Sequence, residues 1–386
     1  MRVQAAAEPT LRERLGQFRR SLSPHDWTSL AGLTGFIVLI HVVGFGILFG
    51  LAAPAHYSLG GDHPTFTIGV GVLAYTFGLR HAFDADHIAA VDNTTRKLLS
   101  DNAEREALGQ PNQRRPLSVG FWFSLGHSTI VFALAFLLAL GVKALASPVE
   151  DDGSTLHSVT GVIGASISGI FLWILGILNL VVLLGIIKVF REMRIGTYDE
   201  QTLEDQLNKR GFMNRFLGGL TKSVRKPWHI YPIGVLFGLG FDTATEVGLL
   251  VLAGGAAAFN LLFYTILVLP ILFAAGMCLM DTADGVFMNA AYGWAFAKPV
   301  RKVFYNITIT SISVAVALII GTVELVGVLA DQANITSGPL GWIANINLDY
   351  AGYAIVGLFF VSWLIALAVW RFGRIESRWS AHLASD

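Results

Sequence analysis

Four segments of the chain carry histidine or acidic residues at helical spacing within otherwise apolar sequence. In the first, GLRHAFDADHIAAVDNTTRK, the residues His81, Asp84 and His87 are each three positions apart. On one continuous helix they would share an arc about 120° wide, because each residue turns the helix by about 100°. Two imidazoles and a carboxylate suit Ni, Co, Zn or Cu(II), whereas Mg or Ca would favour an all-oxygen cage. The spacing predicts a site for a divalent transition metal.

The other three segments read FWFSLGHSTIVF, GLGFDTATEVG and GMCLMDTADGVFMN. They contribute the candidate residues Ser124 and His127, Asp242 and Glu246, and Asp281 and Asp284. His127 is expected to reach the metal from its own helix. The alternative for Ser124 and His127 is hydrogen bonding between helices. The alternative for Asp242, Glu246, Asp281 and Asp284 is that they relay protons or pair helices and take no part in handling the metal.

Four further residues are pathway candidates. Asp86 points away from Asp84 on a helix and is expected to pair with Arg80 or a neighbouring helix, and Asp92 lies farther along the same segment. His41 stands alone in an apolar segment, where a hydrogen-bonded core histidine is the alternative to a functional one. A structural hydrogen-bond network remains the alternative for His81, Asp84 and His87.

The elements that carry these residues are expected to cross a membrane. Hydrophobic residues make up 54% of the 386 residues and charged residues only 14%, against about a quarter charged in soluble domains. Ionisable groups in a bilayer core are costly and therefore mark function. The net charge of zero argues against a basic nucleic-acid binder. One cysteine, Cys278, excludes a disulfide framework or a CxxC zinc site.

Stretches of about 20 mostly apolar residues predict an all-α integral membrane protein with eight transmembrane helices. The predicted spans are 28–52, 66–90, 118–144, 159–187, 230–253, 260–284, 304–329 and 350–371. Nearly all of the 27 Lys and Arg residues lie in the N-terminal segment, alternate loops and the tail. The positive-inside rule therefore predicts that both termini are cytoplasmic.

The resulting organisation has five parts. They are a cytoplasmic N-terminal segment (1–27), helices one to four (28–187), a basic cytoplasmic loop (188–229), helices five to eight (230–371) and a cytoplasmic tail (372–386). The sequence GLRHAFDAD in span two resembles GLGFDTAT in span five, and SLGHSTIVF in span three resembles LMDTADGVF in span six. This similarity suggests an inverted repeat of spans two and three against spans five and six.

The runs RHAFDADHIAAVDNTTRKL, FSLGHSTIVF, LGFDTATE and GMCLMDTADG closely resemble, in order, the four signatures of the nickel/cobalt transporter (NiCoT) family. The resemblance implies a secondary permease of the bacterial cytoplasmic membrane that imports Ni²⁺ and/or Co²⁺ with high affinity. It also implies that His41 and Phe83 tune nickel against cobalt, and the phenylalanine favours acceptance of both metals.

Together these observations predict a transporter that is not an enzyme. Its metal ligands would be His81, Asp84, His87 and His127, its substrate Ni²⁺ or Co²⁺ and its surroundings a lipid bilayer, with no resident cofactor. The motif GxxxxGK[ST] does not occur, so transport is expected to be secondary. The alternatives are a permease for another divalent metal, such as Zn or Mn, and a membrane metalloenzyme. The sequence gives no oligomeric state.

Overall fold

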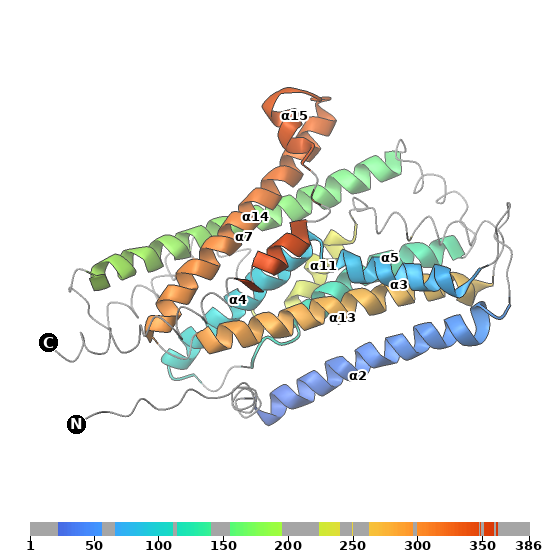
Figure 1. The fold of residues 1–386 in the computed structure, drawn as a ribbon, viewed down its shortest axis with the longest axis horizontal. Coiled ribbons are helices and arrows are strands. Elements are labelled where there is room, and N and C mark those ends of the chain that lie inside the picture. Colours follow the sequence, from blue (N-terminus) through green and yellow to red (C-terminus); the bar gives the residue numbers. More distant parts are fainter. Residues whose placement is uncertain are drawn as a thin grey trace.

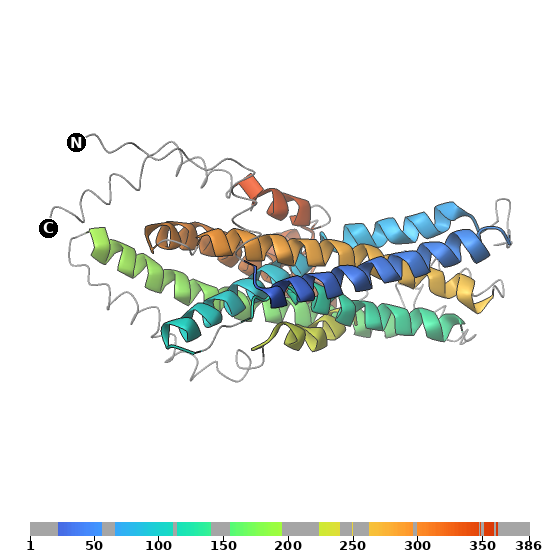
Figure 2. The ribbon, with the colours of Figure 1, turned by 90° about the horizontal axis from the view of Figure 1, so that it is seen from below.

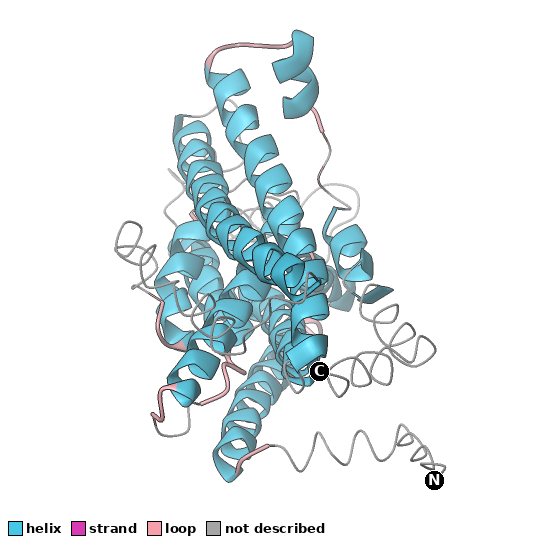
Figure 3. Cartoon of the chain, turned by 90° about the vertical axis from the view of Figure 1, so that its left-hand side faces the viewer, coloured by secondary structure: helices cyan, strands magenta, loops and turns pink. Residues whose placement is uncertain are grey.

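The fold is described from a computed structural model of the chain. It describes residues 22–55, 66–110, 114–139, 155–194, 224–239, 249, 262–295, 299–346, 348, 351–358 and 360–361. Within these ranges the regular structure is helical and there is no strand. Figure 3 shows the long helices packed side by side.

The helices of the described part have the following bounds: α2 Pro24–Ile47, η1 Leu48–Ala52, α3 Ile68–His81, α4 Ala85–Ala107, α5 Val119–Ala139, α7 Thr155–Arg194, η2 Pro227–Ile230, α11 Tyr231–Phe237, α13 Phe263–Ala295, α14 Pro299–Gln332 and α15 Gly338–Ala344. Residues 351–358 form a further helical segment near the C-terminal end. The long helix α13 lies between α2 on one side and α3 and α5 on the other (Figures 1 and 2).

Five helices of the described part are long and apolar enough to cross a membrane. They correspond to predicted spans one, three, four, six and seven, which agrees with a multi-pass membrane protein. Most of predicted spans five and eight, and residues Asp242 and Glu246, lie outside the described residues. The number of eight spans therefore remains a prediction.

Predicted span two, 66–90, is wrong as a single helix. The chain forms two helices, because α3 ends at His81 and α4 begins at Ala85. In the three residues between them the backbone makes tight turns, with Phe83 N donating to Arg80 O (2.9 Å) and Asp84 N donating to His81 O (2.8 Å). Hydrogen bonds that span three residues instead of four overwind the chain and redirect it.

Glycines let two pairs of helices approach closely near this break. A Cβ on Gly276 of α13 would lie 2.6 Å from Tyr75 O of α3, and one on Gly78 of α3 would overlap Phe273 O. Between α5 and α11, a Cβ on Gly126 would overlap Tyr231 O. Small residues at helix interfaces allow such backbone contact in membranes, where packing drives association. These glycines thus allow α3 to lie directly against α13 and α5 directly against α11.

Candidate metal site

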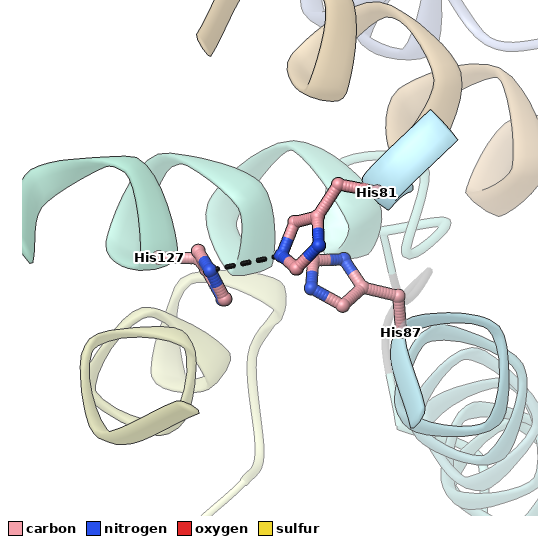
Figure 4. Close-up of side chains that lie close together, drawn as sticks. All are labelled: His81, His87 and His127. Atoms are coloured by element: carbon pink, nitrogen blue, oxygen red, sulfur yellow. Dashed lines mark hydrogen bonds between the residues drawn. The ribbon is translucent and has the colours of Figure 1, made fainter. Parts of the chain in front are cut away.

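Three histidines from three helices meet in the interior of the protein. His81 is the last residue of α3, His87 lies in the first turn of α4, and His127 lies within α5. One ring nitrogen of each lies within 4.8 Å of the others. The three side chains point toward one another (Figure 4), and all three are buried.

The expectation that His81, Asp84 and His87 share one stripe of a continuous helix is wrong, because the helix breaks between the two histidines. The break itself brings them together. The ring centroids of His81 and His87 are 4.5 Å apart, and each lies less than 5 Å from that of His127.

The spacing of the nitrogens suits a shared metal ion. The Nε2 atoms of His81 and His127 are 3.0 Å apart. Two nitrogens bound to one ion at the zinc-like bond length of about 2.1 Å, with angles between about 90° and about 109°, lie roughly 3.0–3.4 Å apart. The same distance also fits a hydrogen bond between one protonated and one unprotonated nitrogen. The two nitrogens can therefore share a proton or bind one metal ion.

Two carboxylates hold the outward nitrogens of the cluster. Asp84 Oδ2 lies 2.8 Å from His81 Nδ1, and Asp281 Oδ2 of α13 lies 3.2 Å from His87 Nδ1. A carboxylate on one ring nitrogen fixes the tautomer and leaves the other nitrogen as a ligand. Within the described part of the chain, Nε2 of His87 has no hydrogen-bond partner. Asp84, expected as a direct ligand, thus contacts Nδ1 of His81, the ring nitrogen opposite the one that faces His127.

Aromatic side chains pack against two of the histidines. The ring of Phe123 lies 4.8 Å from that of His87, and the ring of Phe273 lies 5.5 Å from that of His81. Both phenylalanines are fully buried. Dry walls strengthen electrostatic interactions and raise the cost of an uncompensated charge.

Two more carboxylates continue from the cluster along α4 and α13. Asp92 is fully buried, and its Oδ2 accepts a hydrogen bond of 2.6 Å from Ser313 of α14. Asp284 follows Asp281 by about one turn of α13, and its Oδ2 is buried with no hydrogen-bond partner in the described ranges. An oxygen-rich layer therefore adjoins the histidines.

His41 does not join the cluster. Its Nδ1 lies 2.7 Å from Ile37 O, one turn earlier on α2, and its Nε2 lies 3.2 Å from the hydroxyl of Tyr75 on α3. Both ring nitrogens are engaged when Nδ1 donates to the carbonyl and the tyrosine donates to Nε2. This arrangement agrees with the alternative of a hydrogen-bonded core histidine.

The remaining predicted residues surround the break. Asp86 Oδ1 accepts a hydrogen bond from His87 N at the start of α4, and Arg80 is partly buried in the last turn of α3. Ser124 donates to Gly120 O and lies 3.3 Å from the sulfur of Cys278. It therefore links α5 to α13.

Sequence reasoning missed the role of Ser313 and the partner of His87. Ser313 is one of several hydroxyl residues in the largely apolar helix α14, a common occurrence that carries no signal by itself. Asp281 is 194 positions from His87. No spacing rule predicts a pair so distant in the chain, although the unusual acidic residue in an apolar span marks Asp281 as a candidate.

The chain matches a known family over most of its length. The family model for the high-affinity nickel-transport protein (NicO) matches residues 67–369. The chain belongs to this family. The match confirms the family resemblance drawn from the four sequence signatures.

Curated relatives agree with this assignment. The chain is 56% identical to the nickel transporter NicT of Mycobacterium tuberculosis, over 96% of each chain. It is 46% identical to the nickel transporter NixA of Staphylococcus aureus, over 89% of this chain and 95% of that one. It is 39% identical to the cobalt transport protein NhlF of Rhodococcus rhodochrous, over 90% of this chain and 96% of the relative. No solved structure matches. The family and these relatives are transporters, which agrees with the expectation that the chain is not an enzyme.

Proposed function

We propose that the protein is a secondary transporter that imports Ni²⁺ and/or Co²⁺ across the bacterial cytoplasmic membrane. Its substrate site is formed by His81, His87 and His127. The observation that carries the proposal is the cluster of three buried imidazoles, each offering a nitrogen within 4.8 Å of the others.

The donor set supports a late first-row metal as substrate. Neutral imidazole binds Ni, Co, Zn and Cu, whereas Mg and Ca favour oxygen. A buried site with three nitrogen donors can replace part of the water that such an ion loses on entering the membrane. Named nickel transporters and a named cobalt transporter among the relatives narrow the proposal to these two metals.

The carboxylates have two roles in this proposal. Asp84 and Asp281 orient His81 and His87, because each lies on the nitrogen opposite the one offered to the metal. Asp284 and Asp92 offer oxygens in the next layer. Oxygen ligands bind these metals less tightly than imidazole, so this layer would let the ion leave the histidines.

Alternating access about the cluster is the expected mode of transport. Spans two and three pack on spans six and five through the glycine contacts of α3 with α13 and of α5 with α11. In the inverted repeat, span two corresponds to span five and span three to span six. The contact between spans two and six therefore corresponds to the contact between spans five and three. Such an arrangement supports the inverted repeat suggested by the sequence, which transporters use to open a central site to either side.

The test is uptake of radioactive nickel in a bacterial strain that lacks its own nickel transporters, with and without excess Co²⁺. Saturable uptake that cobalt suppresses is the expected result. Nickel uptake that cobalt leaves unchanged would keep the transport function but remove cobalt as a substrate. If nickel uptake is absent although the protein is in the membrane, the proposal fails, and zinc or manganese becomes the substrate to test.

A further inference from the structure

The helical segment 351–358 packs directly on the break between α3 and α4. Gly352 lies against the backbone of the break so closely that a Cβ at this position would overlap the carbonyl oxygen of Phe83 and lie 3.2 Å from the carbonyl carbon of Asp84. Only glycine leaves room for this approach. In Figure 1 the segment is the short red helix beside α4.

A second contact joins the same two regions through side chains. The ring of Tyr353 stacks on the ring of Phe83, with centroids 4.9 Å apart and planes inclined by 19°. Tyr353 remains 44% exposed, so burial in a core does not account for its placement. Its ring contact within the described part of the chain is the stack on Phe83.

The segment is anchored to the body of the protein. Ile355 is buried in a cluster with Ala85 and Ile88 of α4 and with apolar residues of α7, α13 and α14. Through Ile355, segment 351–358 is thus packed against these helices as well as against the break.

The position of the break determines the geometry of the histidine cluster. His81 precedes the three residues of the break and His87 follows them by one helical turn. A displacement of these three residues changes the direction of α3 relative to α4 and therefore the separation of the two imidazoles. Displacements of about 1 Å in a site can cost two orders of magnitude in activity.

We propose that Gly352 and Tyr353 are positioning residues that hold the α3–α4 break and thereby set the separation of His81 and His87. This inference rests on the proposed function, because it concerns the same site. It assigns a role to the last predicted span, which carries no residue of the cluster.

The first experiment compares Gly352→Ala with Gly357→Ala, a control in the same segment. A Cβ on Gly357 would meet no atom within 4 Å, so both substitutions add one methyl group to one helix, and only the first pushes on the break. Gly352→Ala should reduce nickel uptake about tenfold or more, and Gly357→Ala should leave it within about twofold. Protein in the membrane is quantified for both.

The second experiment uses Tyr353→Leu and the conservative Tyr353→Phe. Loss of the stack in the leucine variant should raise the KM for nickel about threefold to tenfold, and the phenylalanine variant should restore it. Visible absorption of Co²⁺ added to the purified proteins in detergent reports the ligand geometry. The spectrum should change with Gly352→Ala and Tyr353→Leu and stay as in the wild type with the two controls.

The outcomes separate this inference from the proposed function. A wild-type protein that neither transports nor binds metal overturns the function and the inference with it. Wild-type transport together with unchanged KM and Co²⁺ spectrum in Tyr353→Leu overturns the inference alone. The same follows if Gly352→Ala and Gly357→Ala lose uptake equally. If Gly352→Ala does not accumulate, the two tyrosine variants decide.

Discussion

The protein contains two histidine arrangements of different kinds within its membrane helices. At the cluster, three imidazoles face one another, and the Nε2 of His87 has no hydrogen-bond partner among the residues that the structure describes. On α2, His41 is one imidazole whose two nitrogens contact Ile37 O and the Tyr75 hydroxyl. The first arrangement has nitrogens to offer to a substrate, and the second uses its nitrogens to join helices.

We infer from this difference that the hydrogen-bond partners of a histidine, more than its position in the membrane, indicate its role. A hydrogen-bonded histidine already has its polar groups compensated, so metal binding would require breaking those bonds. Adjacent imidazoles whose other ring nitrogens contact carboxylates are, in contrast, stabilised by a bound cation. Both arrangements involve α3, since Tyr75 and His81 lie on the same helix, and they can therefore be compared by substitution.

The largest effect is expected for His87→Ala. Removal of a ligand should lower uptake at limiting nickel by about two orders of magnitude or more, beyond the roughly tenfold to hundredfold loss typical of residues behind a ligand. His41→Ala, measured in the same uptake assay, should retain most transport. Equal losses of uptake in the two variants would show that His87 and His41 do not differ in their importance for transport.

Asp281→Asn should have the next largest effect. The amide keeps the size of the side chain but removes the charge that orients His87, so the KM for nickel should rise about tenfold to hundredfold. Asp331→Asn is the matched control, because Asp331 is exposed near the end of α14. An unchanged KM in Asp281→Asn would show that the carboxylate has no part in metal binding.

A smaller effect is expected for Gly276→Ala, which tests the helix contact that supports both arrangements. Its Cβ would lie 2.6 Å from Tyr75 O, and overpacking of this kind costs about 1–3 kcal/mol. The melting temperature in detergent should fall, whereas Gly327→Ala on α14, which meets nothing within 4 Å, should leave it unchanged. The two melting temperatures would be equal if α3 and α13 did not approach so closely.

The smallest effect is expected for Tyr75→Phe. The substitution removes one hydrogen bond to His41 and keeps the ring, at a cost of about 0.5–1.5 kcal/mol of stability. Nickel KM should stay within about twofold, because neither residue contacts the cluster. A KM change as large as that of Asp281→Asn would place His41 and Tyr75 in the transport pathway.

Much of this site was predictable from residue types. Asp281, His81, His87 and His127 are ionisable residues in apolar sequence, where the cost of burial leaves function as the default explanation. The family signatures also lie in the sequence itself. The prediction that His81, Asp84 and His87 share one face of a continuous helix was wrong, however. No glycine or proline between His81 and His87 indicates the break in the sequence.

The sequence by itself determined the membrane character, the candidate residues and the family, since these depend on hydropathy, charge and motif order. Only the tertiary structure decided which candidates meet. It separated His41 from the cluster, placed Asp281 on His87 and brought Gly352 against Phe83. Such contacts depend on how helices distant in sequence pack, and packing is set by the shapes of all the helices together.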